Sequence, residues 1–201
     1  MTKTTKPHVI LTDRFFKALE YAADAHEMQV RKSTNIAYIS HPLGVAALIL
    51  EAGGDEDQAI AGLLHDVAED CGGEVQIDKI RHRFGDRVAN IVLGCSDSLV
   101  SNEAEKEEWS IRKAKHLEHL KVSDADVLLV TAADKTHNAR AIVTDLQNIG
   151  DQVWERFNKQ TNRERIIKYY LAIYEVLAEK QVTPNLLKPL YTAIEIMSAS
   201  S

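Results

Sequence analysis

Apolar residues recur at intervals of three and four along nearly the whole chain, as Phe15, Leu19 and Ala22 illustrate. That spacing places apolar side chains on one face of an α-helix, whereas a half-buried strand needs sustained alternation of apolar and polar residues. No stretch of the chain shows such alternation. The sequence therefore predicts an all-α fold.

Helix-capping and helix-ending residues divide this pattern into a bundle of about ten helices. Pro42 suits the first turn of a helix, Gly53-Gly54 can end that helix, and Asp55 can cap the next one. Pro189 should kink or restart the last helix. The helices are expected at about 13–29, 42–53, 56–70, 76–84, 86–98, 104–120, 124–148, 151–157, 162–180 and 184–197.

The composition is that of a globular protein, because 201 residues, 45% of them hydrophobic, suffice for one domain with its own core. We expect that domain at 13–201, after an N-terminal tail at 1–12. A net charge of -6 argues against non-specific binding to nucleic acid and favours a metabolite as partner. No apolar run approaches the roughly 18 residues of a membrane span or resembles a signal peptide, so we expect a cytoplasmic location and no membrane contact.

A cluster of acids follows a His-Asp doublet in the stretch His65-Asp66-Val67-Ala68-Glu69-Asp70. On a helix, Asp66, Glu69 and Asp70 share one face. Cys71-Gly72-Gly73 would end that helix directly afterwards. The stretch is the centre of the candidate site.

Two further residues, His41 and Asp134, extend this candidate site. His41 stands at the predicted entrance of the helix that begins near Pro42, where a rigid helix end would hold it. Asp134 directly follows a near-continuous apolar run at 127–132, which places a carboxylate deep in the bundle, where it needs a cation. An ion pair with Lys135 or Arg140 is the alternative explanation for Asp134.

Two imidazoles and two carboxylates from three helices can hold one divalent ion and leave positions for water and substrate. Nitrogen and oxygen ligands suit Mn, Fe, Co, Zn or Ni. The two cysteines, Cys71 and Cys95, lack C-x-x-C spacing and are expected to be reduced thiols outside any metal site. Glu69 and Asp70 could orient a water or take its proton, although a solvated acidic helix end would look the same in sequence.

The remaining histidines are weaker candidates. His116 and His119 form an H-x-x-H pair without the glutamate of a zinc protease motif, so we expect both to face solvent. His26 and His137 could each border the site or lie in the interior with satisfied hydrogen bonds. His8 and His82 belong to no constellation.

Several motifs in a fixed order resemble the HD hydrolase domain of RelA/SpoT-type proteins. They are Ala25-His26-Glu27-Met28-Gln29-Val30-Arg31-Lys32-Ser33, Tyr38-Ile39-Ser40-His41-Pro42-Leu43, Ala61-Gly62-Leu63-Leu64-His65-Asp66-Val67-Ala68-Glu69-Asp70, Phe84-Gly85, Gly94-Cys95-Ser96-Asp97 and Ala133-Asp134-Lys135-Thr136-His137-Asn138-Ala139-Arg140. The resemblance covers roughly 14–178. With no synthetase domain following, the chain is most similar to the stand-alone small alarmone hydrolases, so the domain at 13–201 is expected to be an HD phosphohydrolase domain.

The resemblance implies a function and a role for each motif residue. It implies a metal-dependent 3′-pyrophosphohydrolase of (p)ppGpp or (p)ppApp that releases pyrophosphate and a 5′-nucleotide. The metal, usually Mn²⁺, would be held by His41, His65, Asp66 and Asp134. Glu69 and Asp70 would activate the attacking water. The nucleotide would be bound by Arg31, Lys32, Ser33 and, at its sugar, Asn138.

The residues also support a nucleotide pocket independently of the resemblance. Arg31 can grip or stack on a planar base and Lys32 can act as a point charge toward phosphate, although an exposed basic pair is the plain alternative. Two positions depart from the family pattern. Ala141 stands where a threonine is common, and Asp97 is an acid where bifunctional members often have Thr-Lys.

Two other functions stay open. One is an HD-domain nucleotidase acting on 5′-phosphates, against which the Arg31-Lys32-Ser33 element argues. The other is a non-catalytic nucleotide-binding module, against which the intact Glu69-Asp70 pair and the complete ligand set argue.

Overall fold

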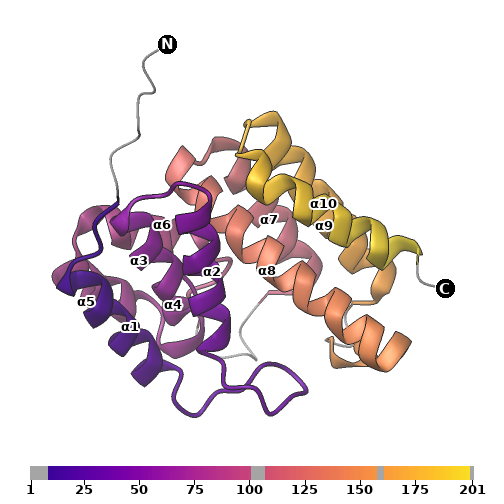
Figure 1. Cartoon of the computed structure of the whole chain (residues 1–201), viewed down its shortest axis with the longest axis horizontal. Coiled ribbons are helices and arrows are strands. Elements are labelled where there is room, and N and C mark those ends of the chain that lie inside the picture. The colour runs from indigo at the N-terminus through magenta and orange to yellow at the C-terminus, as the bar shows by residue number, and fades with distance from the viewer. Residues whose placement is uncertain (1–8, 101–106, 158–160, 200–201) are drawn as a thin grey trace.

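Helices form the regular structure of the described residues, so the predicted all-α fold is confirmed (Figure 1). The structure is a computed structural model and describes residues 9–100, 107–157 and 161–199. Its elements are α1 (Asp13–Ala25), α2 (Ser40–Glu51), α3 (Glu56–Leu64), α4 (Val67–Cys71), α5 (Glu74–Phe84), α6 (Asp86–Cys95), α7 (Trp109–Val122), α8 (Ala125–Ile149), the 3-10 helix η2 (Gly150–Arg156), α9 (Arg163–Glu179) and α10 (Pro184–Ala199). Most of the predicted tail at 1–12 and the predicted helix start at 104 lie outside the described residues.

Local capping explains why several helices begin and end where the sequence predicts. Asp55 and Gln58 form a reciprocal capping box at the start of α3, which satisfies two backbone amides that the first helical turn leaves open. The helix α4 ends at Gly72, whose φ of 135° lies in a region that glycine adopts without strain. Pro42 lies in the first turn of α2 and His41 directly precedes it, as expected.

The predicted helix at 56–70 is wrong in one respect, because it is two helices with a break at the His-Asp doublet. Helix α3 ends at Leu64, His65 and Asp66 form a turn, and α4 begins at Val67. In an unbroken helix the Gly62 carbonyl would pair with the amide of Asp66, but it accepts a hydrogen bond of 2.8 Å from Nδ1 of His65. The amide of Asp70 still donates to the Asp66 carbonyl at 2.9 Å, so a helical turn links the doublet to the acids.

Smaller differences concern helix ends. Helix α1 stops at Ala25 rather than near 29, because the chain turns there and the Gln29 carbonyl accepts the amide of Tyr38 at 3.0 Å. The segment predicted as a helix at 151–157 is the 3-10 helix η2. Helix α10 continues through Pro189, so the predicted restart does not occur.

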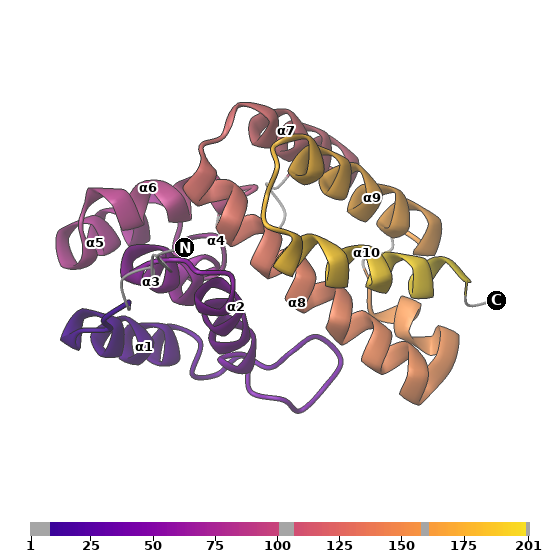
Figure 2. The same ribbon diagram turned by 45° about the horizontal axis from the view of Figure 1, so that its top comes forward.

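Helix α8 is the central element of the fold. It packs against α2, α3 and α6 on one side and against α9, α10 and η2 on the other. Figures 1 and 2 show α8 lying between the N-terminal helices and the pair α9 and α10. Several of its side chains are fully buried, including Val130, Ala133 and Ala139. Burial of a large apolar side chain such as that of Val130 contributes roughly 1.5–3 kcal/mol to the stability of the fold. A residue on α8 is therefore held rigidly in the middle of the molecule.

The loop at 26–39, between α1 and α2, extends from the end of the N-terminal helices (Figure 1). Its two arms are tied by the bridge between Val30 and Ala37, in which the Arg31 amide donates to the Ile36 carbonyl at 2.8 Å. The only β pairing of the described residues is this bridge. The loop carries the predicted nucleotide contacts.

Two further expectations concern the whole chain. Cys71 and Cys95 are both free, as predicted. No helical stretch in the described part of the chain has the length and hydropathy that crossing a bilayer requires.

Candidate functional site

The four predicted metal ligands converge from three parts of the fold: α2, the turn after α3, and α8. Nε2 of His41 lies 3.4 Å from Oδ2 of Asp66 and 3.2 Å from Oδ1 of Asp134. Nε2 of His65 lies 3.1 Å and 3.7 Å from the same two oxygens. Bonds of about 2.1 Å to one ion would set neighbouring ligand atoms roughly 3.0–3.4 Å apart. Three of the four spacings match this range, and the spacing between His65 and Asp134 is wider, so the arrangement suits a metal after a small adjustment at Asp134.

The protonation of His65 gives a second reason to place a cation here. Its Nδ1 faces the Gly62 carbonyl at 2.8 Å and must donate to it, so in the neutral ring Nε2 carries a lone pair. Nε2 is buried without a hydrogen-bond partner of acceptable geometry, although two carboxylates approach it. A lone pair facing carboxylates is repelled unless a proton or a metal ion lies between them.

The pKa shifts of His65, Asp66 and Asp134 also indicate that this site favours a positive charge. Burial opposes a charge on His65, but the Asp66 and Asp134 carboxylates raise its pKa well above the ordinary value. Burial likewise opposes ionisation of Asp66 and Asp134, yet the imidazoles and, for Asp134, Lys135 hold both pKa values well below the ordinary range. Without a metal the cluster must hold a proton, and a divalent ion can take its place. The donor set therefore fits a metal.

Both carboxylates among the predicted ligands are held by other side chains. The hydroxyl of Tyr38 donates to Oδ2 of Asp66 at 2.7 Å, and Nδ2 of Asn138 donates to Oδ1 of Asp134 at 2.5 Å. Nζ of Lys135 donates to the other oxygen of Asp134 at 2.6 Å, so the alternative ion pair exists alongside the contacts with the imidazoles. Such supporting contacts fix ligand geometry in metal sites.

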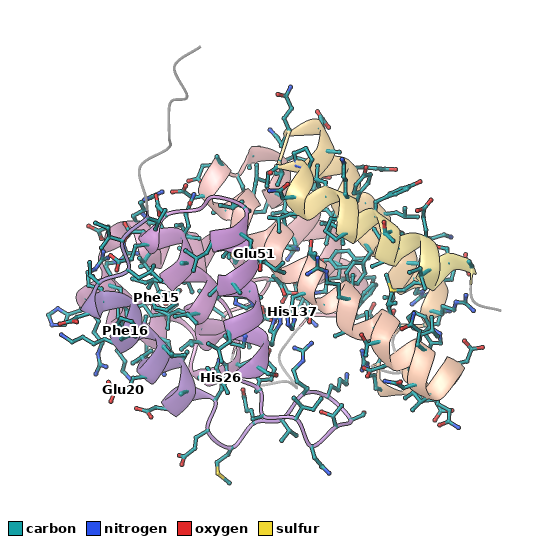
Figure 3. All side chains as sticks on the ribbon, viewed as in Figure 1. Phe15, Phe16, Glu20, His26, Glu51 and His137 are labelled. Carbon is teal, nitrogen blue, oxygen red and sulfur yellow. The ribbon has the colours of Figure 1, made fainter. Side chains whose placement is uncertain are left out.

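His137 supports His41 in the same way. Their Nδ1 atoms are 2.9 Å apart. Burial, with the nearby charges of His41 and Arg31, lowers the pKa of His137 to about 4, so its ring is neutral. Because Nε2 of His41 faces the predicted metal site, Nδ1 of His41 is assigned as the donor and Nδ1 of His137 as the acceptor. Figure 3 shows His137 between α2 and α8. Gly44 on α2 makes room for it, because a Cβ there would come within 2.2 Å of the His137 ring.

Glu69 and Asp70 lie on α4 directly after the ligands. Oε2 of the half-buried Glu69 accepts the amide of Asp97 at 3.2 Å. Burial, followed by the carboxylates of Asp97 and Asp66, raises the pKa of Glu69 to about 8. A carboxyl group that titrates near neutral pH suits proton transfer. The alternative of a solvated acidic helix end matches the exposed Asp70 but not Glu69.

A cavity of about 760 Å³ adjoins the cluster of four predicted ligands. His137 and Asn138, which bond to the ligands His41 and Asp134, also line this cavity. Four cationic side chains line this cavity: Arg31, Lys32, Arg140 and Arg156. Arg31 donates from Nη2 to Oδ1 of Asn138 at 2.7 Å, which joins the loop at 26–39 to α8. Ser33 does not line the cavity; it is exposed in a turn with a φ of 61°. Ala141, the departure from the family pattern, does line it.

The structure corrects the prediction for one of the other histidines, His116. His116 was expected to face solvent but is buried, with Nδ1 2.7 Å from the hydroxyl of Tyr169 on α9. His119 is exposed, as predicted. His26 is buried against Tyr38, with ring centroids 4.7 Å apart, and its Nδ1 contacts Oε1 of Gln29. Its Nε2 is buried without a hydrogen-bond partner, so His26 is an interior histidine whose hydrogen bonds are only half satisfied.

Some residues of the site escaped the sequence reasoning. Tyr38 stood within a quoted motif, but nothing in the sequence pairs it with Asp66. The distal wall of the cavity, formed by Arg156 and Phe157 of η2 and its end, follows no recognisable motif. Both depend on tertiary contacts between segments distant in sequence.

Comparison with known proteins decides the family. The model of the HD domain matches residues 18–182. The chain belongs to the HD domain family. This HD domain is 31% identical over 175 residues to the guanosine-3′,5′-bis(diphosphate) 3′-pyrophosphohydrolase MESH1 of Xenopus tropicalis, covering 86% of this chain and 87% of that one.

Longer relatives carry the same domain. A probable guanosine-3′,5′-bis(diphosphate) 3′-pyrophosphohydrolase of Synechocystis is 34% identical over 70% of this chain, and the bifunctional (p)ppGpp synthase/hydrolase SpoT of Escherichia coli is 32% identical over 83%. The HD domain chain spans only 18% and 22% of these two proteins.

Solved structures share the fold of this HD domain. A metazoan ortholog of SpoT, described as hydrolysing ppGpp, superposes with a TM-score of 0.73 at 26% identity, covering 96% of this chain and 97% of its own. A Listeria monocytogenes protein superposes with a TM-score of 0.65 at 27% identity, covering 77% of this chain and 96% of its own. An HD hydrolase implies a divalent metal, and His41, His65 and Asp66 offer ligand atoms within 4.8 Å of one another.

Proposed function

We propose that this HD domain is a metal-dependent 3′-pyrophosphohydrolase of the alarmone nucleotides (p)ppGpp or (p)ppApp. The observation that carries the proposal is the shared wall between the ligand cluster and the cationic cavity. His137 and Asn138 line the cavity and also bond to the ligands His41 and Asp134. A nucleotide in the cavity would thus lie beside the cluster. The names of the relatives, MESH1 among them, support this substrate class.

The metal would be held by His41, His65, Asp66 and Asp134, with Mn²⁺ as the proposed ion and another divalent transition metal as the substitute. A metal bound there supplies Lewis acidity and lowers the pKa of water. The mixed imidazole and carboxylate donors suit such ions. The carboxylate oxygens approach the imidazole nitrogens to between 3.1 and 3.7 Å, so little rearrangement is needed.

The chain's own residues would handle water and substrate. Glu69 and Asp70 orient the attacking water and exchange protons with it. Arg31 grips or stacks on the planar base, Lys32 offers positive charge to phosphate, and Asn138 contacts the sugar. Ser33 is included on the resemblance alone. Water attacks the phosphorus next to the 3′ oxygen, the bond from that phosphorus to the 3′ oxygen breaks, and the 3′ oxygen gains a proton. The products are a 5′-nucleotide and intact pyrophosphate.

The remaining proposals concern the protein as a whole. One HD phosphohydrolase domain occupies 13–201, with 1–12 as a tail. Its partner is a small nucleotide rather than nucleic acid or a membrane, and its location is the cytoplasm.

A substrate panel tests this function. Protein freed of metal and then supplied with Mn²⁺ is incubated with ppGpp, pppGpp, ppApp, 5′-monophosphates and deoxynucleoside triphosphates, and products are separated by anion-exchange chromatography. We expect GDP, GTP or ADP with pyrophosphate from the 3′-pyrophosphorylated nucleotides. Cleavage of 5′-phosphates alone would instead identify a nucleotidase, and binding without any cleavage would identify a non-catalytic module.

A further inference from the structure

Asp97 lies in the segment just after α6 and contacts Glu69 of the candidate site. Its backbone amide donates to Oε2 of Glu69 at 3.2 Å. Ser96 caps the end of α6, with its hydroxyl donating to the Val92 carbonyl at 3.0 Å, so the chain leaves the helix along a defined path. The function proposed above uses Glu69 but assigns nothing to Asp97.

The side chain of Asp97 is fastened to α7 by two cations. Oδ1 accepts from Nη1 of Arg112 at 2.7 Å, and Oδ2 accepts from Nζ of Lys113. Only 4% of the Asp97 side chain is exposed, against 14% for Arg112 and 20% for Lys113. A carboxylate withdrawn from water this far is stable only when paired, so the two cations fix the position of Asp97.

This arrangement links Glu69, through Asp97, to helix α7. Helix α4 has only five residues, and its main packing partners are α5 and α1. The groups that face the Glu69 carboxyl are Asp97 from the segment after α6, Lys113 from α7 and Asp66 from the turn before α4. Asp97 is the one of these that also bonds to Glu69 through its backbone.

We propose that Asp97 is a positioning residue, clamped by Arg112 and Lys113, that holds the Glu69 carboxyl in its working orientation beside the metal ligands. The inference rests on the proposed function. When water adds to phosphorus and the 3′ oxygen leaves, one proton departs from the water and one arrives at the 3′ oxygen. A carboxyl group that exchanges either proton must be aimed to within a fraction of an ångström, and Asp97 supplies that aim.

A double-mutant cycle in kcat tests the inference. Asp97→Asn keeps the shape of the side chain but removes the charge that Arg112 and Lys113 hold. In the native background we expect kcat to fall about 10-fold or more while KM and bound metal stay unchanged. In a Glu69→Gln background, the same substitution should change kcat by less than about 2-fold, because the carboxyl group that Asp97 positions is already absent. An equal loss in both backgrounds would mean a merely structural role and would overturn the inference.

Two controls keep the outcome interpretable. Asp86→Asn makes the same change on α6 at a side chain that is 81% exposed and paired with Arg81, and should leave kcat unchanged. If Asp97→Asn unfolds, the double variant Asp97→Asn/Arg112→Met replaces it in the cycle, because it removes one of the two cations left unpaired and keeps Lys113, which faces Glu69. A native protein that cleaves no 3′-pyrophosphorylated nucleotide refutes the proposed function, whereas an active native protein with additive variants refutes only the role of Asp97.

A measurement without turnover completes the test. In metal-free protein labelled with ¹³C at glutamate carboxyls, the signal that Glu69→Gln removes should titrate near pH 8 in the native chain. Removing the Asp97 charge should move that midpoint to lower pH, because a neighbouring anion favours the protonated form. An unmoved midpoint would show that Asp97 does not act on Glu69.

Discussion

At the scale of one residue, the imidazole of His65 shows why the four predicted ligands need a cation between them. Its Nδ1 is committed to the Gly62 carbonyl, and its Nε2 is turned toward Asp66 and Asp134. The side chain is buried, so water cannot relieve the repulsion between the lone pair and the carboxylates. The sequence could predict the ligand set from residue types and order, but not this tautomer, because it depends on a backbone carbonyl exposed by a helix break.

Asp66→Ala should remove the metal without unfolding the bundle. Asp66 lies in a turn and its side chain is 22% exposed, so its loss creates no core cavity, while the site loses one charged ligand. We expect native helical content by circular dichroism and loss of nearly all bound Mn²⁺ by atomic emission, with activity falling in parallel. The exposed Asp86→Asn serves as the matched control. Stoichiometric metal in Asp66→Ala would rule out its role as a ligand.

Glu69→Gln should change how stability depends on pH. The pKa of Glu69 is raised to about 8 in the folded state from an ordinary 4.5, so the native fold keeps a proton that the unfolded chain releases. Native stability therefore falls as pH rises from about 4.5 to 8, and glutamine, which cannot titrate, avoids that loss. In metal-free protein, thermal melts should show the variant gaining in Tm over the native chain between pH 5 and pH 8. A constant difference across that range would contradict the raised pKa.

At the scale of elements, local signals account for most of the helices. The residues of the α3 capping box lie close together in sequence, and so do those of the apolar run in α8, so local spacing alone predicts each of these elements. The break between α3 and α4 was not predictable, since the residues at the break suit a helix until the His65 ring binds the Gly62 carbonyl. The burial of His116 was missed for a related reason, because α9 covers α7 only in the folded chain.

Gly44 on α2 packs closely against the ring of His137 on α8, beside the predicted ligand His41. Alanine there stabilises an isolated helix by about 1 kcal/mol, yet its Cβ would come within 2.2 Å of the His137 ring. The ring must move and release Nδ1 of His41. We expect Gly44→Ala to weaken Mn²⁺ binding by about 10- to 100-fold in calorimetric titrations. Leu43→Ala, at the exposed neighbouring position on α2, is the control and should bind as the native chain does.

At the scale of the whole molecule, the cavity exists only because the loop at 26–39 folds back onto α8. Arg31 and Asn138 are 107 residues apart and share a hydrogen bond of 2.7 Å. The sequence motifs predicted that both residues serve one nucleotide. They did not predict the contribution of η2, because Arg156 and Phe157 reach the cavity through the path of the chain after α8.

Arg31→Ala and Asn138→Ala should each lower kcat/KM for a 3′-pyrophosphorylated nucleotide. Because Asn138 also bonds to Asp134, its loss should affect metal binding slightly, whereas Arg31→Ala should leave the metal untouched. The two residues contact each other, so the double variant should lose less than the product of the single losses. Steady-state kinetics on the four proteins measure the coupling, and independent, negligible effects would place both side chains outside the substrate site.

The central claim is that this metal cluster directs water to the phosphorus beside the 3′ oxygen of an alarmone nucleotide. Hydrolysis of ppGpp in ¹⁸O-labelled water, with about one equivalent of Mn²⁺, tests it most directly when products are read by mass spectrometry and ³¹P NMR. We expect equal amounts of GDP and pyrophosphate, with the ¹⁸O label in the pyrophosphate, and no turnover by Asp66→Ala. Orthophosphate in place of pyrophosphate, label in the GDP, or equal rates for the native chain and Asp66→Ala would contradict it.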